Sequence, residues 1–207
     1  MTFAQMQAET RRQLNESSVV FWTDQDIKDA INEGMDELAD IAEYYERQAT
    51  LPMLAGRSYY DLTSVLPDTV LSPRHIWNTT TQRWLEQVDT LQMDGGYRQW
   101  ELVHGEPEKF VIRGHWWLGA WPKRDTDSSS LRLYYTGIPD HLSASTDVPP
   151  FPQEFHMGPV EFALSDLNSQ QRETKRAVKH WNEFMSYAAR LKAYADQRAS
   201  IPRRGAL

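Results

Sequence analysis

The sequence predicts an α+β fold in which four helices, two near each end of the chain, form a frame around an inserted small antiparallel β module. Apolar residues recur every three or four positions in both end segments, and the spacing shifts toward two in the middle. Six of the eight tryptophans lie between Trp77 and Trp121, so the middle also differs in composition. We expect an N-terminal helical part at residues 1–46, a Trp-rich β insertion at 47–146, and a C-terminal helical part with a basic tail at 147–207.

Two capping signals mark the N-terminal helices. Thr2 can cap a short helix that ends near Leu14. Thr23 followed by Asp26 forms a capping box with Asp in place of the usual Glu, and predicts where the second helix starts. That helix contains Gly34, which costs about 1 kcal/mol relative to alanine unless close packing requires it. We therefore expect a neighbouring helix to cross at Gly34.

Segments with a period of two predict strands in the middle of the chain. Gln48–Leu51 and Ser58–Leu62 are expected to form a hairpin around Leu54-Ala55-Gly56. Further strands are expected at Arg83–Val88, Lys109–Arg113, Trp116–Trp121 and Leu131–Tyr135. In the last of these segments Leu131, Leu133 and Tyr135 alternate with Arg132 and Tyr134, which is typical of a half-buried strand.

Two helices are expected after the β insertion. Pro152 can open the first, which runs to about Asn168 with a bend at Gly158-Pro159. The second is expected from about Gln170 to Ser200. It carries an apolar seam at Ala177, Trp181, Phe184, Ala188, Leu191 and Ala195. Such a seam packs either in the core of its own domain, which is the commoner case, or against a partner helix in a coiled-coil dimer.

Composition and charge exclude several classes of protein. The chain has no cysteine, which removes disulfide scaffolds, zinc fingers and cysteine nucleophiles. No apolar run approaches the roughly 18 residues of a membrane span, and no secretory leader is expected. The net charge of −7 is uneven, with −7 in residues 1–61, −3 in 62–150 and +3 in 151–207. A basic protein that wraps DNA is therefore not expected.

Enzyme and metal motifs are missing from the sequence. There is no phosphate-binding glycine loop, nucleophile elbow or H-E-x-x-H pattern, and no two histidines are spaced three or four apart. Carboxylate pairs such as Asp36 with Asp40 are better explained as a solvated helix face than as an acid–base pair. We expect no catalytic residues, no metal and no cofactor.

The tryptophans of the insertion allow two interpretations. Trp100, Trp116, Trp117 and Trp121 could form a stacking platform for sugars or bases. The alternative is that they fill the core of the β module or its interface with a neighbouring protein, since large aromatics anchor both. We favour the core or interface.

The order of several segments resembles a known family. The N-terminal segments are Phe3 and Met6, Arg11-Arg12-Gln13-Leu14-Asn15-Glu16, Phe21-Trp22-Thr23-Asp24-Gln25-Asp26-Ile27 and Ala30-Ile31-Asn32-Glu33-Gly34. The later segments are Leu54-Ala55-Gly56 with Tyr60-Asp61-Leu62, Gly105-Glu106-Pro107, Trp121-Pro122, Tyr134-Tyr135 with Ile138-Pro139, and Val148-Pro149 with Phe151-Pro152-Gln153-Glu154-Phe155-His156. Together they resemble the head-to-tail adaptors, or connector and head-completion proteins, of tailed bacteriophages.

The resemblance implies a virion structural protein without catalytic activity. It implies a ring, commonly of twelve copies, that docks beneath the portal protein, extends the DNA channel and offers a platform to the tail or nozzle protein. Genomic DNA would pass without sequence-specific binding, and no membrane is involved. The expected locations are the portal vertex of the virion and, during assembly, the host cytoplasm.

The adaptor interpretation assigns candidate surfaces to three regions. The channel-lining candidates are Asp29, Glu33, Asp36, Glu37 and Asp40, because like charge keeps DNA from sticking. Their alternative roles are to face solvent or to pair with Lys and Arg of a neighbour. The portal-contact candidates are Arg198, Ile201, Arg203, Arg204 and Leu207. The tail or neighbour candidates are Trp100, Trp116, Trp117 and Trp121.

Two other functions remain open on the sequence alone. A carbohydrate-binding module or glycan-acting protein would use Trp100, Trp116 and Trp117 as its platform. A DNA-binding regulator is disfavoured by the negative charge and the lack of a basic recognition helix.

Overall fold

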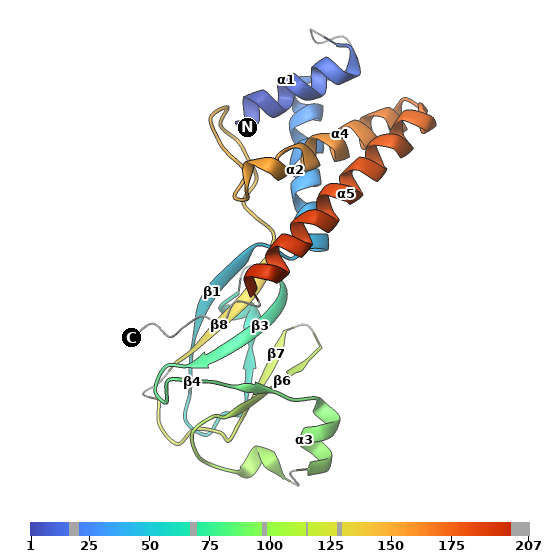
Figure 1. The fold of residues 1–207 in the computed structure, drawn as a ribbon. Helices are drawn as coiled ribbons and strands as arrows, with labels where there is room; N and C mark the ends of the chain where they lie inside the picture. Colours follow the sequence, from blue (N-terminus) through green and yellow to red (C-terminus); the bar gives the residue numbers. More distant parts are fainter. Residues whose placement is uncertain (17–20, 67–69, 97–98, 115, 128–129, 200–207) are drawn as a thin grey trace. The chain divides into compact units, whose positions relative to one another are not determined.

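The computed structural model describes residues 1–16, 21–66, 70–96, 99–114, 116–127 and 130–199 (Figure 1). Its described residues contain five α-helices and two four-stranded sheets, so the predicted α+β class is confirmed. The chain divides into two compact units. We call Met1–Tyr45 with Ile138–Leu207 the helical unit, and Glu46–Gly137 the β unit.

The helical unit holds α1 (Phe3–Leu14), α2 (Asp24–Ala42), α4 (Met157–Gln170) and α5 (Thr174–Ala199). Both predicted N-terminal caps are confirmed. The Thr2 side chain accepts from the backbone N–H of Gln5, and Thr23 does the same for Asp26 while the Asp26 side chain accepts from the Thr23 backbone. Each box satisfies backbone donors that a helix start leaves without partners.

Two apolar clusters hold the helices of this unit together. One joins α1, α2 and α4 through residues that include Phe3, Ile31 and Leu164. The other joins α2, α4 and α5 through Phe162 and Phe184, among others. Gly34 lies where α2 crosses α4, because a Cβ there would sit 2.9 Å from the Cβ of Phe162 and from the carbonyl oxygen of Pro159. The crossing predicted at Gly34 is therefore confirmed.

The β unit consists of two sheets and one short helix. Its elements are β1 (Glu46–Pro52), β2 (Tyr59–Asp61), β3 (Val70–Asn78), β4 (Arg83–Trp84), β5 (Glu86–Gln87), α3 (Thr90–Gly96), β6 (Lys109–Arg113), β7 (Trp117–Trp121) and β8 (Ser130–Gly137). The sheet orders are β1-β8-β3-β4 and β2-β7-β6-β5. All strand pairs are antiparallel except β5 with β6. The first strand of the unit pairs with the last, Glu46 opposite Thr136, so the chain enters and leaves the unit side by side.

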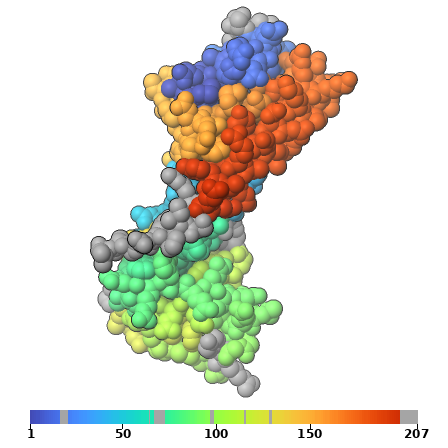
Figure 2. Space-filling model, in the orientation of Figure 1, coloured from blue at the N-terminus to red at the C-terminus, as the bar shows by residue number. Residues whose placement is uncertain are grey.

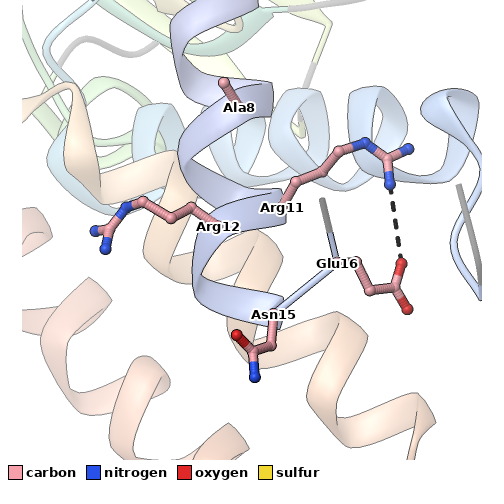
Figure 3. Close-up of a pocket in the computed structure, with 5 residues that line it drawn as sticks. All are labelled: Ala8, Arg11, Arg12, Asn15 and Glu16. Carbon is pink, nitrogen blue, oxygen red and sulfur yellow. Dashed lines mark ion pairs between the residues drawn. The ribbon is translucent and has the colours of Figure 1, made fainter. Parts of the chain in front are cut away.

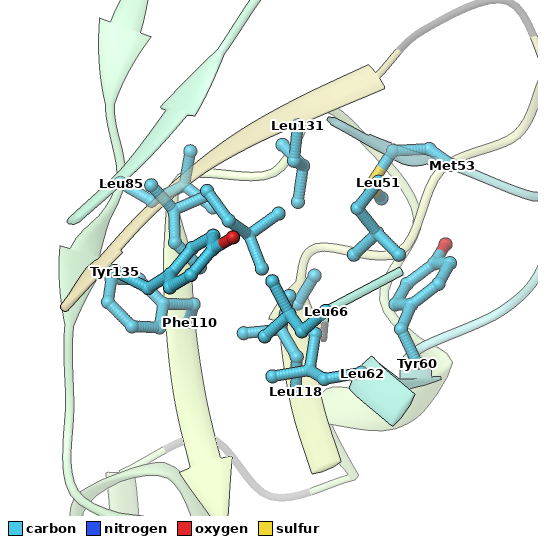
Figure 4. Close-up of a cluster of buried hydrophobic side chains, with 13 residues drawn as sticks. Leu51, Met53, Tyr60, Leu62, Leu66, Leu85, Phe110, Leu118, Leu131 and Tyr135 are labelled. Atoms are coloured by element: carbon cyan, nitrogen blue, oxygen red, sulfur yellow. The ribbon is translucent and has the colours of Figure 1, made fainter. Parts of the chain in front are cut away.

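The main core of the β unit forms between its two sheets (Figure 4). Leu51, Leu131 and Tyr135 come from the first sheet, and Phe110 and Leu118 from the second. The alternation predicted for Leu131–Tyr135 is confirmed, since Leu131, Leu133 and Tyr135 are buried and Arg132 is exposed. A smaller cluster packs α3 and Trp100 against β6.

The predicted hairpin is wrong. Gln48–Leu51 lies in β1 and pairs with β8, whereas the segment from Ser58 contributes β2, which pairs with β7 in the other sheet. The Leu54-Ala55-Gly56 turn therefore connects two sheets rather than two neighbouring strands, and long-range pairing overrides the local turn signal. The expected strand at Arg83–Val88 is divided into β4 and β5, which belong to different sheets.

Three further differences concern helices. α3 was not expected, because Gly95 and Gly96 at its end suggested a break. Pro152 caps a short 3-10 turn at Gln153–Phe155, and α4 starts only at Met157. Gly158 and Pro159 thus lie in the first turn of α4, where proline is tolerated, so the expected mid-helix bend is absent from this described segment.

Candidate interaction surfaces

The outer face of α2 is strongly acidic. Asp29, Glu33, Glu37 and Asp40 are exposed, and Asp36 is half-buried. The face is set by the helix itself, because Ile27, Ile31 and Leu38 on the other side are buried in the core of the unit. The structure therefore brings the five predicted carboxylates together along one helix.

These carboxylates have different surroundings. Asp36 accepts from His141 Nε2 at 2.9 Å, and Asp29 accepts from the amide of Gln25 at 2.7 Å. The pKa of Glu33 is raised, first by partial burial and then by the negative charges of Asp166, Glu37 and Asp36. Glu33 and Glu37 thus share an acidic region with Asp166 of α4, whereas Asp36 is held by a histidine.

The outer face of α5 is partly apolar, which the sequence interpretation missed. Val178, Trp181 and Met185 are 54%, 41% and 38% exposed. Ala177, Phe184, Ala188 and Leu191 of the predicted seam are buried, but Trp181 lies at the edge of that seam. Its spacing of three from Val178 and four from Met185 was the available signal for a second stripe.

The predicted tryptophans of the β unit do not form one platform. Trp100 is only 3% exposed, and its indole N–H donates to Asp94 at 3.0 Å. Trp116 and Trp121 are half-buried and pack against the two clusters of the β unit. Trp117 is 50% exposed. Trp117 is thus the member of this group with the most surface for a partner.

A different aromatic group lies on the outer face of the first sheet. Trp84 is half exposed, and its ring centroid lies 5.0 Å from Trp77, 5.4 Å from Tyr134 and 5.9 Å from His75. The pairing of Trp77 with Trp84 and of His75 with Tyr134 brings these rings from three strands together. This group could not be predicted without β3, which no sequence pattern indicated.

The predicted portal-contact residues fall at the C-terminal end. Arg198 lies in the last turn of α5, and its side chain is outside the described residues. Ile201, Arg203, Arg204 and Leu207 also lie outside the described residues.

A hollow of about 500 Å³ lies at the end of α1 and is lined by Ala8, Arg11, Arg12, Asn15 and Glu16 (Figure 3). Arg11 faces Glu16 at 3.8 Å and bonds to Asp24 at 2.6 Å, while Arg12 pairs with Glu9. Both arginines are thus already engaged by carboxylates of the same unit.

Among the described residues, no three His, Asp or Glu side chains gather closely enough to hold a metal ion. None of the described helices is both long and apolar enough to cross a membrane.

Comparison with known proteins gives one family. No curated protein matches the chain. The family described as SU10 adaptor protein matches residues 1–206, almost the whole chain. The carbohydrate alternative gains no support from this match, and Trp100 of its platform is buried. The chain therefore belongs to the SU10 adaptor family of bacteriophage head-to-tail adaptors.

Proposed function

We propose that the chain is a structural component of the virion that forms a ring beneath the portal protein, extends the DNA channel and provides the platform on which the tail docks. The family match over residues 1–206 carries this proposal. The ring is expected to contain twelve copies and to sit at the portal vertex, after assembly in the host cytoplasm.

The acidic face of α2 supports a lining role. Asp29 and Asp40 are exposed, and Asp36 is half-buried and accepts from His141. Carboxylates repeated around a ring would repel the phosphates of passing DNA and limit adhesion. We propose that these three residues line the channel.

The remaining surfaces are assigned to the two neighbours of the ring. We propose that the C-terminal segment with Arg198, Ile201, Arg203, Arg204 and Leu207 contacts the portal, because its arginines suit an acidic partner. For the tail we propose Trp117 and the Trp84 aromatic group, since exposed aromatic side chains often anchor protein interfaces.

The proposal is tested by mixing the purified protein with purified portal from the same phage. Light scattering after size-exclusion chromatography gives the mass of the complex, with each protein alone as control. We expect a defined complex with several copies per portal, even if the protein alone is monomeric, because many weak contacts add up in a ring. Absence of association under salt conditions that keep the portal ring intact would contradict the proposal.

A further inference from the structure

The exposed apolar stripe on α5 consists of Val178, Trp181 and Met185. Figure 2 shows α5, coloured orange-red to red, along the visible face of the helical unit. The Trp181 ring lies 6.2 Å from that of Phe162 and 5.5 Å from that of Phe184, so the stripe is supported by the core beneath it. Large apolar side chains gathered on one exposed helix face are typical of a protein contact.

Three acidic side chains lie on α2 and α4, the helices that Phe162 connects to the stripe. Phe162 of α4 contacts Trp181 and also lies directly against Gly34 of α2, so it connects the two helices. One turn further along α4 is Asp166; partial burial first, and then the negative charges of Asp166 and Glu37, raise the pKa of Glu33. We define the acidic surface as Glu33, Glu37 and Asp166.

A lysine surface lies beside the stripe on α5. Lys175 and Lys179 are exposed, and neither has an ion-pair partner among the described residues. Lys179 lies two positions before Trp181, which is about 200° around the helix and hence away from Phe162. The lysines therefore lie on the side of α5 away from α4, whereas the acidic surface lies on α2 and α4.

The charges of whole helices follow the same division. α2 contains seven Asp or Glu residues and one Lys, whereas α5 contains six Lys or Arg residues and two Asp or Glu. Opposite charge on two different surfaces of one chain is complementary between copies, and it also sets their orientation. A contact between two different surfaces repeats from copy to copy and closes into a ring when the rotation between copies allows it.

We propose that the lysine surface of one copy, Lys175 and Lys179, packs against the acidic surface of a second copy, Glu33, Glu37 and Asp166, with the Val178–Trp181–Met185 stripe buried between the two copies. This inference rests on the proposed ring and identifies the surfaces that join its subunits. The stripe supplies the apolar area of the contact, and the charges select its register. Asp29, Asp36 and Asp40 are not assigned to this contact, and we keep them as the channel-lining candidates.

Charge reversal tests the contact. The first variant carries Glu33→Lys and Glu37→Lys, and the second carries Lys175→Glu and Lys179→Glu. All four side chains are exposed, so circular dichroism should show the fold of the wild type for both variants. Each variant alone should lose the multi-copy complex on the portal. An equimolar mixture should restore it, because copies that alternate around the ring would again place opposite charges at each contact.

Two controls separate this contact from general effects. Glu108→Lys with Glu154→Lys changes the net charge as much as the first variant, at exposed positions elsewhere, and should assemble like the wild type. Val178→Asp should weaken assembly without altering the fold, because Val178 is more than half exposed.

The outcomes distinguish this inference from the proposed function. If the wild type assembles on the portal and both reversal variants assemble equally well, the assigned contact is wrong and the adaptor role stands. Loss of assembly in each variant without rescue in the mixture would also overturn the pairing. If the wild type forms no multi-copy complex, both the adaptor role and the contact are contradicted.

Discussion

The helical unit and the β unit use their large side chains differently. In the β unit most large apolar residues lie between the two sheets or in the small cluster between α3 and β6, which includes Trp100. In the helical unit α5 places Phe184 in the core and, one residue later, exposes Met185 beside Trp181. Charge is divided as well, since α2 is acidic and α5 is basic. The β unit also exposes large apolar side chains, among them Leu91, Leu102 and Trp117. What distinguishes the helical unit is that Val178, Trp181 and Met185 share one helix face and that its charges are divided between α2 and α5.

The largest expected losses of stability come from truncating a buried phenylalanine in the core of either unit. Phe184→Ala in the helical unit and Phe110→Ala in the β unit should each cost about 3–5 kcal/mol, because both side chains are fully buried and leave cavities. Denaturant unfolding followed by far-ultraviolet circular dichroism and by tryptophan fluorescence would measure both. A cost below about 1 kcal/mol for either variant would contradict the burial described for its unit.

The next effect tests the helix crossing at Gly34. Gly34→Ala should destabilise the protein by about 1–3 kcal/mol, because the added Cβ meets the Phe162 Cβ and the Pro159 backbone. The same exchange at Gly95, where nothing lies within 4 Å, should be neutral or stabilise by up to about 1 kcal/mol, since alanine is the better helix former. Thermal unfolding of both variants makes the comparison. Equal behaviour would show that α2 and α4 do not approach closely.

A smaller effect is expected at the start of α2. Thr23→Ala removes the side-chain acceptor for the Asp26 N–H and should cost about 1 kcal/mol. Thr23→Ser keeps a hydroxyl at that place and should recover most of the loss. Urea titration of the three proteins checks this, and a Thr23→Ser variant as unstable as Thr23→Ala would show that the hydroxyl is not what stabilises the helix.

The smallest expected effect concerns pH. Burial lowers the pKa of His156, whose Nε2 donates to the Phe151 carbonyl at 2.9 Å and whose Nδ1 accepts from the Met1 ammonium at 2.6 Å. The folded protein then binds a proton less readily than the unfolded chain. The stability that neutral His156 contributes is fully present above pH 6.5, the ordinary pKa of histidine. It is lost as the pH falls through the lowered pKa of His156.

Stability measured from pH 8 downward should therefore decline below the ordinary histidine value of about 6.5. His156→Gln keeps one donor and one acceptor but cannot be protonated, so its decline over this interval should be shallower. An unchanged slope in His156→Gln would assign the decline to other groups. The backbone N–H groups of Ser143 and Ala144 lower the pKa of Asp147, so protonation of Asp147 reduces the stability only at more acidic pH.

Local signals predicted the helical unit better than the β unit, for a physical reason. Thr23 with Asp26 defines a helix start within four residues. Gly34 indicates a close crossing because glycine is unfavourable inside a helix unless a neighbour packs too closely for a side chain. Strand partners are set by contacts far apart in the sequence, so the Leu54-Ala55-Gly56 turn could not reveal that β1 pairs with β8. Strand β3 contains Pro73 and lacked a clear period of two, so it was missed.

The candidate surfaces follow the same rule. The acidic face of α2 was predictable because helical periodicity places its carboxylates together. The buried state of Trp100 and the exposed state of Trp117 were not predictable, since both belong to one aromatic-rich segment and only the packing of α3 and β6 separates them. The exposed stripe on α5 was missed because Trp181 was assigned to the buried seam.

The most direct test of the adaptor role is native mass spectrometry of the complex between purified portal and this protein. The account predicts one dominant species whose mass exceeds that of the portal ring by a whole number of copies, with twelve as the expected number. A spectrum that contains only free portal and free protein, under conditions in which the portal ring stays intact, would contradict it.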